Sequence, residues 1–213
     1  MVDPSLRKRA STARAALEAG HLRGPALREL FLTIPAADRD AWADELLLLE
    51  EPPPSRVPLP RGGVPYLPCG VDDVLTMVQS VPIGPEDDFV DLGSGLGRVA
   101  ILVHLLTGAR TAGVEIQAAL VQEAQHGAQS LALPAVTFLH ADAADVELAG
   151  SVFFLYAPFN GALLVRVLDR LRAVAERRSI VVCTVALELA HVPWLTPRSA
   201  PSPTLHVYDG GVR

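Results

Sequence analysis

Short apolar runs and longer amphipathic stretches alternate along the second two thirds of the chain. The runs have the length of buried strands and lie at residues 89–92, 111–115, 136–139, 152–156, 180–185 and 205–208. The stretches between them carry apolar residues at helical spacing and predict helices at 71–81, 98–106, 117–131 and 162–177. Strands that alternate with helices indicate βαβ units. We therefore predict an α/β fold with a doubly wound, mostly parallel sheet.

The first 65 residues have a different pattern. Helices are predicted at 5–18, 26–32 and 36–49. Residues 51–65 contain six prolines and two glycines, and a helix is excluded there because proline fixes φ and lacks the N–H donor. We expect residues 1–50 to form a helical N-terminal extension or lid, residues 51–65 a proline-rich linker, and residues 66–213 the main domain.

Composition excludes several classes of protein. A formal net charge of −6 over 213 residues makes nucleic acid an unlikely partner. The two cysteines, Cys69 and Cys183, form no C-x-x-C pair, and the six histidines lack metal-ligand spacing, so no disulfide framework and no metal site are predicted. Neither a secretory signal nor a membrane-spanning run is visible. We expect a soluble, cytoplasmic protein with no membrane partner.

The strongest motif follows the first predicted strand and reads Asp91-Leu-Gly-Ser-Gly-Leu-Gly97. Its glycines allow a sharp turn and let a ligand approach the backbone closely. Dinucleotide-binding loops place a third glycine where this chain has Arg98. Asp91 also disfavours a pyrophosphate and favours a ligand that carries a positive charge.

A second acid stands at the end of the next predicted strand. Glu115 follows Asp91 by 24 residues, and an acid in this position can accept both hydroxyls of a ribose. Taken singly, Asp91 is also compatible with a turn or capping residue, and Glu115 with an ordinary surface acid. Their joint spacing with the glycines favours a nucleoside-bearing ligand.

Asp91-Leu-Gly-Ser-Gly-Leu-Gly97 resembles motif I of class I S-adenosylmethionine-dependent methyltransferases, and Glu115 matches their ribose-binding acid. Leu139-His-Ala-Asp-Ala143 resembles the segment of this family that holds the adenine. The resemblance covers about residues 66–185 and implies a Rossmann-like, seven-stranded sheet with an antiparallel last strand near residues 204–209. It also implies S-adenosyl-L-methionine as the cofactor. The implied cofactor-binding residues are Tyr66, Asp91, Gly93, Ser94, Gly95, Gly97, Glu115, Ile116, Asp142 and Ala143.

Asp142 has an alternative interpretation, because Asp145 follows it and either residue could cap a short helix after Asp142. Tyr66 has one too, as a linker residue packed on the core. Both alternatives stay open at this point.

The acceptor side is expected after the fourth strand, since open α/β sheets bind ligands beyond the carboxyl ends of their strands. Tyr156-Ala-Pro-Phe159 stands where amino-group methyltransferases often have Asn/Asp-Pro-Pro-aromatic, and the tyrosine puts adenine or guanine N-methylation in doubt. Tyr156 and Asn160 are the candidate catalytic residues, by aromatic contact with a cation and by an amide oxygen that accepts an N–H. Tyr156 is equally compatible with a strand end whose hydroxyl has a partner, and a role of Asn160 in the site is equally open. His140 is a weaker candidate for a general base.

The acceptor itself stays open. The motif I region and Gly113-Val-Glu-Ile116 are similar to non-SET protein-lysine methyltransferases, which favours transfer to a nitrogen or oxygen, with a protein lysine as one candidate. A shallow acidic groove near Asn160 would support that acceptor. A deep apolar pocket roofed by residues 1–50 would support a small-molecule methyltransferase of secondary metabolism. A module that binds the cofactor without catalysis is the third alternative.

Overall fold

The computed structural model describes residues 3–50 and 58–211. A seven-stranded sheet forms its centre. The strands are β1 (Asp88–Leu92), β2 (Arg110–Glu115), β3 (Val136–His140), β4 (Val152–Tyr156), β5 (Ile180–Val185), β6 (Leu195–Pro197) and β7 (Leu205–Gly210).

The strand order is β3-β2-β1-β4-β5-β7-β6. The first five strands in this order are parallel, whereas β7 is antiparallel to both of its neighbours. The order reverses between β1 and β4, which creates the switch point where open α/β sheets bind their ligands. The predicted α/β class, the mostly parallel sheet and the antiparallel last strand are confirmed.

One strand was not among the predicted ranges. β6 has three residues and ends in Pro197, so it shows no alternation that a sequence pattern could reveal. It lies at the edge of the sheet, where a proline is tolerated because no further strand needs its N–H.

Seven α-helices and one short 3-10 helix accompany the sheet in the described residues. Three α-helices precede it, namely α1 (Pro4–Glu18), α2 (Gly24–Leu32) and α3 (Arg39–Leu47), and the 3-10 turn η1 (Ala36–Asp38) leads into α3. The others are α4 (Val71–Ser80), α5 (Arg98–Thr107), α6 (Ala118–Ser130) and α7 (Gly161–Ala175). The predicted helix at 36–49 is shorter than expected, because Leu48 adopts a left-handed conformation with φ of 58° and ends it.

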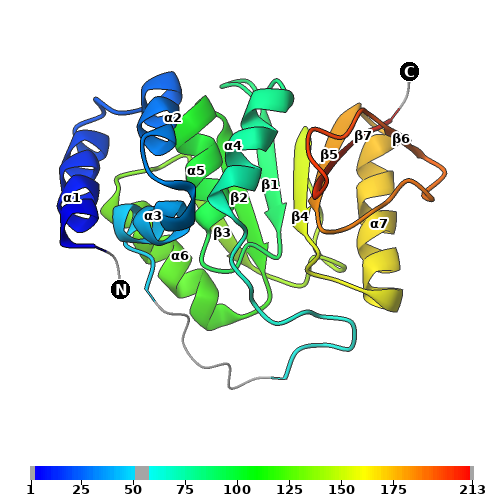
Figure 1. Cartoon of the computed structure of the whole chain (residues 1–213). Coiled ribbons are helices and arrows are strands. Elements are labelled where there is room, and N and C mark those ends of the chain that lie inside the picture. Colours follow the sequence, from blue (N-terminus) through cyan, green and yellow to red (C-terminus); the bar gives the residue numbers. More distant parts are fainter. Residues whose placement is uncertain (1–2, 51–57, 212–213) are drawn as a thin grey trace.

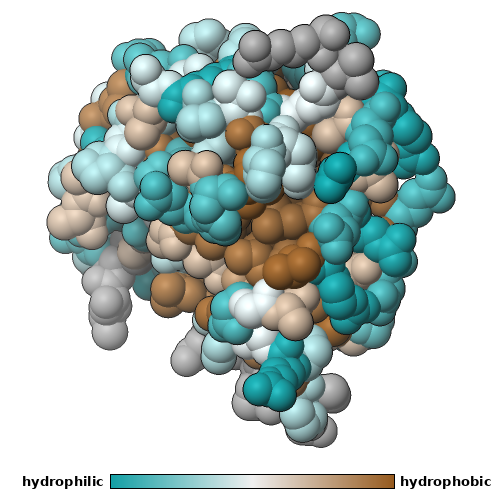
Figure 2. Space-filling view, turned by 90° about the vertical axis from the view of Figure 1, so that its right-hand side faces the viewer, coloured by the Kyte–Doolittle hydropathy of each residue, from teal (hydrophilic) through white to brown (hydrophobic). Residues whose placement is uncertain are grey.

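Two apolar layers enclose the sheet. One contains residues of α1 to α6 packed on side chains such as Phe89 and Phe154, and the other is formed by α7 and the segments around 143–148 and 189–195. Figure 1 shows α1, α2 and α3 grouped at one end of the molecule and α7 at the other. Figure 2 views the molecule from the α7 side, where a continuous hydrophobic area is surrounded by hydrophilic residues.

The helices are too short or too polar to cross a membrane; this holds for all helices in the described part of the chain.

Candidate active site

A cavity lies at the carboxyl ends of the parallel strands, beside the switch point. Its walls come from the segments that follow β1, β2, β3, β4 and β5, and from residues 59–67, which we call the arm. Figure 1 shows the arm running below the lower ends of β1 and β4 before it enters α4. The predicted site residues that line the cavity are Tyr66, Gly93, Glu115, Ile116, Asp142, Ala143 and Tyr156.

The glycine loop after β1 is held against the end of β2. The backbone N–H groups of Gly93 and Ser94 both donate to the carbonyl of Val114, at 2.8 and 3.2 Å. Gly95 has φ of +53° and lies under the ring of Tyr66, where a Cβ would come within 2.1 Å of a ring carbon. The loop therefore needs a glycine at position 95 both for its conformation and for the approach of the arm.

Gly97 and Ser94 serve the packing beneath the loop. A Cβ at Gly97 would lie 2.4 Å from the ring of Phe138, so the glycine lets α5 begin directly against β3. The Ser94 hydroxyl is buried next to Gly113 and has no hydrogen-bond partner among the described residues. A contact from either residue to a cofactor stays a prediction.

Glu115 joins the glycine loop to the cavity. Its carboxylate oxygens accept hydrogen bonds from the backbone N–H groups of Gly95, at 3.0 Å, and Gln117, at 2.9 Å. The side chain is buried and yet lines the cavity. Since each carboxylate oxygen can accept more than one hydrogen bond, the group can order the loop and still receive ligand hydroxyls.

Asp91 is a buried carboxyl without a hydrogen-bond donor in the described structure. It is 3% exposed and lies at the end of β1, beneath the loop rather than in the cavity wall. Burial, with the nearby charge of Glu115, raises the pKa of Asp91 to about 8. A buried acid that lacks a partner disfavours its own charged form, and a cation brought close to it would supply the missing interaction.

The adenine candidates lie in a turn after β3. Asp142 lines the cavity, and its side chain accepts a hydrogen bond from the N–H of Ala144 at 2.8 Å. Residues 142–145 form a turn and not the short helix considered from sequence. Asp142 thus stabilises its own turn and also faces the cavity, together with Ile116 and Ala143.

The arm is fixed to the chain after β4 by backbone hydrogen bonds. The N–H of Val64 donates to Pro158 at 3.1 Å, and the N–H of Asn160 donates to Gly62 at 2.8 Å. Gly63 and Phe159 form an isolated antiparallel bridge between them. Sequence reasoning named only Tyr66 on this arm, although the glycine pair at 62–63 marks a turn that allows the pairing.

The two candidate catalytic residues are placed differently. Tyr156 ends β4 and lines the cavity, and burial, helped by the nearby Cys69 and Asp73, raises its pKa. Asn160 is exposed at the start of α7 and does not line the cavity. His140 is also outside the cavity wall, with its Nε2 3.0 Å from the carbonyl of Ile116.

Two alanines with a left-handed backbone conformation were not identified from the sequence. Ala157 and Ala186 directly follow the paired strands β4 and β5, have φ of 38° and 55°, and line the cavity. A non-glycine residue in this conformation costs roughly 1–2 kcal/mol, and such strain gathers at functional sites. No sequence pattern marks an alanine as left-handed, so only the structure could find this pair.

Comparisons with known proteins agree with this fold and these motifs. Residues 69–153, less than half of the chain, match the family model described as histone methylation protein DOT1. An RNA methyltransferase from Salinibacter ruber, solved with S-adenosyl-L-homocysteine, has a TM-score of 0.56 and 23% identity over 69% of this chain and 95% of its own. TrmN from Thermus thermophilus has a TM-score of 0.51 and 16% identity over 64% of this chain and 48% of its own. No curated protein matches the chain.

The similarity to solved structures supports the fold, whereas the family model and the sequence motifs support the class of protein. The family model begins at Cys69, after the arm, and ends within β4, and so includes the glycine loop and Glu115. Together with the sheet order, these features make the chain a class I S-adenosylmethionine-dependent methyltransferase. S-adenosyl-L-methionine is the cofactor of that class.

Glu115→Ala is expected to weaken the binding of S-adenosylhomocysteine about 10- to 100-fold, because two charge-assisted hydrogen bonds are lost, one to Gly95 of the glycine loop and one to Gln117 before α6. Glu115→Gln, which keeps one acceptor, should lose less. Calorimetric titration of both variants measures this, with the exposed Glu123→Ala on α6 as the control. Binding of Glu115→Ala within twofold of wild type would refute the role of Glu115.

Proposed function

We propose that this chain transfers the methyl group of S-adenosylmethionine to an amine nitrogen, with the side chain of a protein lysine as the favoured acceptor. The observation that carries the proposal is the surroundings of Tyr156. Tyr156 lies in the wall of a largely apolar cavity, and burial, followed by Cys69 and the carboxylates of Asp73 and Asp40, raises the pKa of its phenol. Such surroundings attract a cationic acceptor from outside and strip it of water inside.

The cofactor supplies an activated methyl group, and the residues present fit it. Asp91 offers a buried carboxyl without a partner to the cationic amino-acid end. Glu115 and Asp142 offer acceptors for the ribose and the adenine, and Ile116 offers an apolar face. Tyr66 lies over Gly95 and closes the methionine side. In this assignment the loop and the arm bind, orient and exclude water.

The acceptor must reach the methyl group as a neutral amine, because an ammonium has no free electron pair. Ala157, Pro158 and Ala186 line this part of the cavity and provide no carboxylate. Desolvation by such walls lowers the pKa of an entering amine and favours its neutral form. Asp73, whose charge acts on Tyr156, would attract the ammonium, whereas the apolar interior would favour release of its proton to water. Methyl transfer should therefore become faster as the pH rises.

Neither an acidic groove beside Asn160 nor an apolar pocket roofed by the N-terminal helices is found in the described part of the chain. No described residue between 3 and 50 lines the cavity, so the N-terminal helices do not roof it. The carboxylates that line it belong to Glu115 and Asp142, not to a groove beside Asn160. A small apolar molecule remains the second candidate, because the arm contributes mainly apolar side chains such as Leu59 and Val64. The family model, described as a histone methylation protein, supports a protein acceptor.

The test is a screen with radiolabelled cofactor against lysine peptides and small amines and hydroxyl compounds, with wild type and Asp73→Asn. For a lysine acceptor we expect Asp73→Asn to raise the KM for the peptide about 3- to 10-fold, because the attraction of one partly screened carboxylate for the lysine ammonium is lost. Its affinity for S-adenosylhomocysteine should stay unchanged. Asp72→Asn, which alters the adjacent carboxylate, is the control. Transfer only to uncharged small molecules, with no effect of Asp73→Asn, would refute the lysine proposal.

A cytoplasmic location is part of the same proposal. Both Cys69 and Cys183 are free and buried, which suits a reducing compartment.

A further inference from the structure

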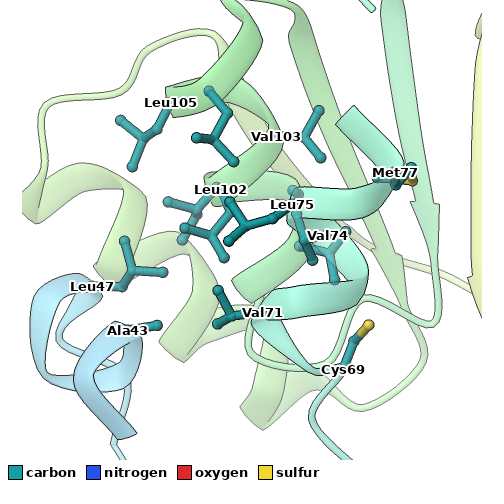
Figure 3. Close-up of a cluster of buried hydrophobic side chains, with 14 of the residues drawn as sticks. Ala43, Leu47, Cys69, Val71, Val74, Leu75, Met77, Leu102, Val103 and Leu105 are labelled. Carbon is teal, nitrogen blue, oxygen red and sulfur yellow. The ribbon is translucent and has the colours of Figure 1, made fainter. Parts of the chain in front are cut away.

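The three N-terminal helices pack on the back of the cofactor half and not on the cavity. Figure 3 shows Ala43 and Leu47 of α3 facing Val71 and Leu75 of α4 and Leu102 of α5. All five side chains are buried in the larger apolar core. Because α5 begins directly after the glycine loop, α3 lies against the helix that carries this loop.

Arg98 is the polar connection between these parts. It is the first residue of α5 and only 5% exposed, in the first turn of a helix, where the helix dipole disfavours a cation. The guanidinium donates to Asp44 of α3 through Nε at 3.1 Å and Nη2 at 2.5 Å, and to Asp40 at 3.4 Å. Two carboxylates from α3 thus stabilise a charge that its own helix does not.

The same guanidinium also holds the segment that joins the arm to α4. Its Nη1 donates to the carbonyl of Cys69 at 2.9 Å, and Asp40 accepts a hydrogen bond from the N–H of Val71 at 2.8 Å. Tyr66, which lies over Gly95, is near enough for Arg98 to influence its pKa. One buried side chain therefore joins α3, the chain before α4 and the end of the glycine loop.

We propose that Arg98 is a positioning residue that couples the N-terminal helices to the cofactor site. Contact of Asp44 and Asp40 with Arg98 holds the glycine loop and the arm in the conformation that binds the cofactor. By thermodynamic linkage, a bound cofactor stabilises the contact of α3 to the same extent. Residues 39–47 then act on the site from behind, which replaces the expected role of a lid. The inference rests on the proposed binding of the cofactor at the glycine loop.

Hydrogen exchange of the wild-type protein with and without saturating S-adenosylhomocysteine tests the coupling without any substitution. We expect slower exchange at residues 93–97 and, at the same time, at residues 39–47. Protection of 93–97 with no change at 39–47 would overturn the coupling alone. No protection at either segment would overturn both the cofactor site and the coupling.

Substitutions distinguish the effect of the hydrogen bonds to Arg98 from the effect of the general packing of α3. Asp44→Asn should weaken S-adenosylhomocysteine about 5- to 10-fold and remove the protection of 39–47, since Arg98 keeps Cys69 and Asp40 and the protein stays folded. Asp72→Asn is the matched control, because the Arg39–Asp72 ion pair also joins α3 to α4 but does not touch Arg98. Arg98→Lys should restore part of what Arg98→Gln loses. Equal losses for Asp44→Asn and Asp72→Asn would overturn the proposal.

Discussion

Asp91→Asn is expected to lower the affinity for S-adenosylhomocysteine about 100-fold and, at the same time, to stabilise the protein without ligand above pH 6. The affinity falls because the buried carboxyl at the end of β1 can give up its proton and meet a cation as a carboxylate, whereas an amide cannot. The stability rises because a buried carboxyl with no hydrogen-bond donor loses more on ionisation than it gains from its neighbours. Function and stability oppose each other at this residue.

The pH dependence of stability has a definite sign. The pKa of Asp91 is about 8 in the folded protein and about 4 in an unfolded chain, so the folded state holds its proton more tightly. Stability from this group is fully present below pH 4 and is lost as the pH rises toward 8. Asn carries no such dependence. Its stability advantage over Asp should therefore grow by about 2 kcal/mol between pH 6 and 8.

Denaturant unfolding at pH 5, 6, 7 and 8, with and without S-adenosylhomocysteine, measures both effects. Asp88→Asn is a control on the same strand with the opposite sign, because the hydrogen bond from Arg110 lowers the pKa of this half-buried acid. Its Asn variant should gain nothing at high pH. A stability difference between Asp91→Asn and wild type that stays constant from pH 5 to 8 would show that Asp91 does not titrate as the burial implies.

The sequence predicted the central strands β4 and β5 best because these strands are buried on both faces. β4 and β5 are continuous apolar runs, and their predicted bounds equal the observed ones. The glycine loop could be predicted for a similar reason, since only glycine satisfies its conformation and its close contacts, as at Gly95 and Gly97. Local chemistry and tertiary structure agree at these positions, so a pattern within one segment is enough.

The remaining features depend on contacts between distant segments. Arg98 and Asp44 are 54 residues apart in sequence, and no local pattern pairs them. The arm was interpreted as linker up to residue 65, although its backbone bonds to residues 158–160 bring Gly63 and Val64 into the cavity wall. Asn160 was favoured for its amide, but its backbone N–H is used in that pairing while its side chain stays exposed. Such placements follow from the fold and are visible only once the segments are brought together.

Gly95→Ala is expected to reduce the affinity for S-adenosylhomocysteine at least about 30-fold, because it displaces the ring of Tyr66 on the arm. The added methyl group would lie 2.1 Å from ring carbon Cε2 and 2.3 Å from Cδ2 of Tyr66, so the ring must leave its place over the loop. The left-handed conformation at position 95 adds roughly 1–2 kcal/mol of strain. The hydrogen bond from the Gly95 N–H to Glu115 would be disturbed by the same displacement.

A double-mutant cycle with Tyr66→Ala separates the clash from the strain. If the clash dominates, Gly95→Ala should cost little further affinity once the ring is absent, so the two substitutions should be strongly non-additive. Thermal unfolding checks that all three variants stay folded, and Gly20→Ala, which has a similar φ of +73° but nothing within 4 Å, is the control for strain alone. An equal loss from Gly95→Ala in both backgrounds would place the requirement for glycine in the loop itself. The non-additive result would instead make the contact between Tyr66 and Gly95 the element that closes the cofactor site.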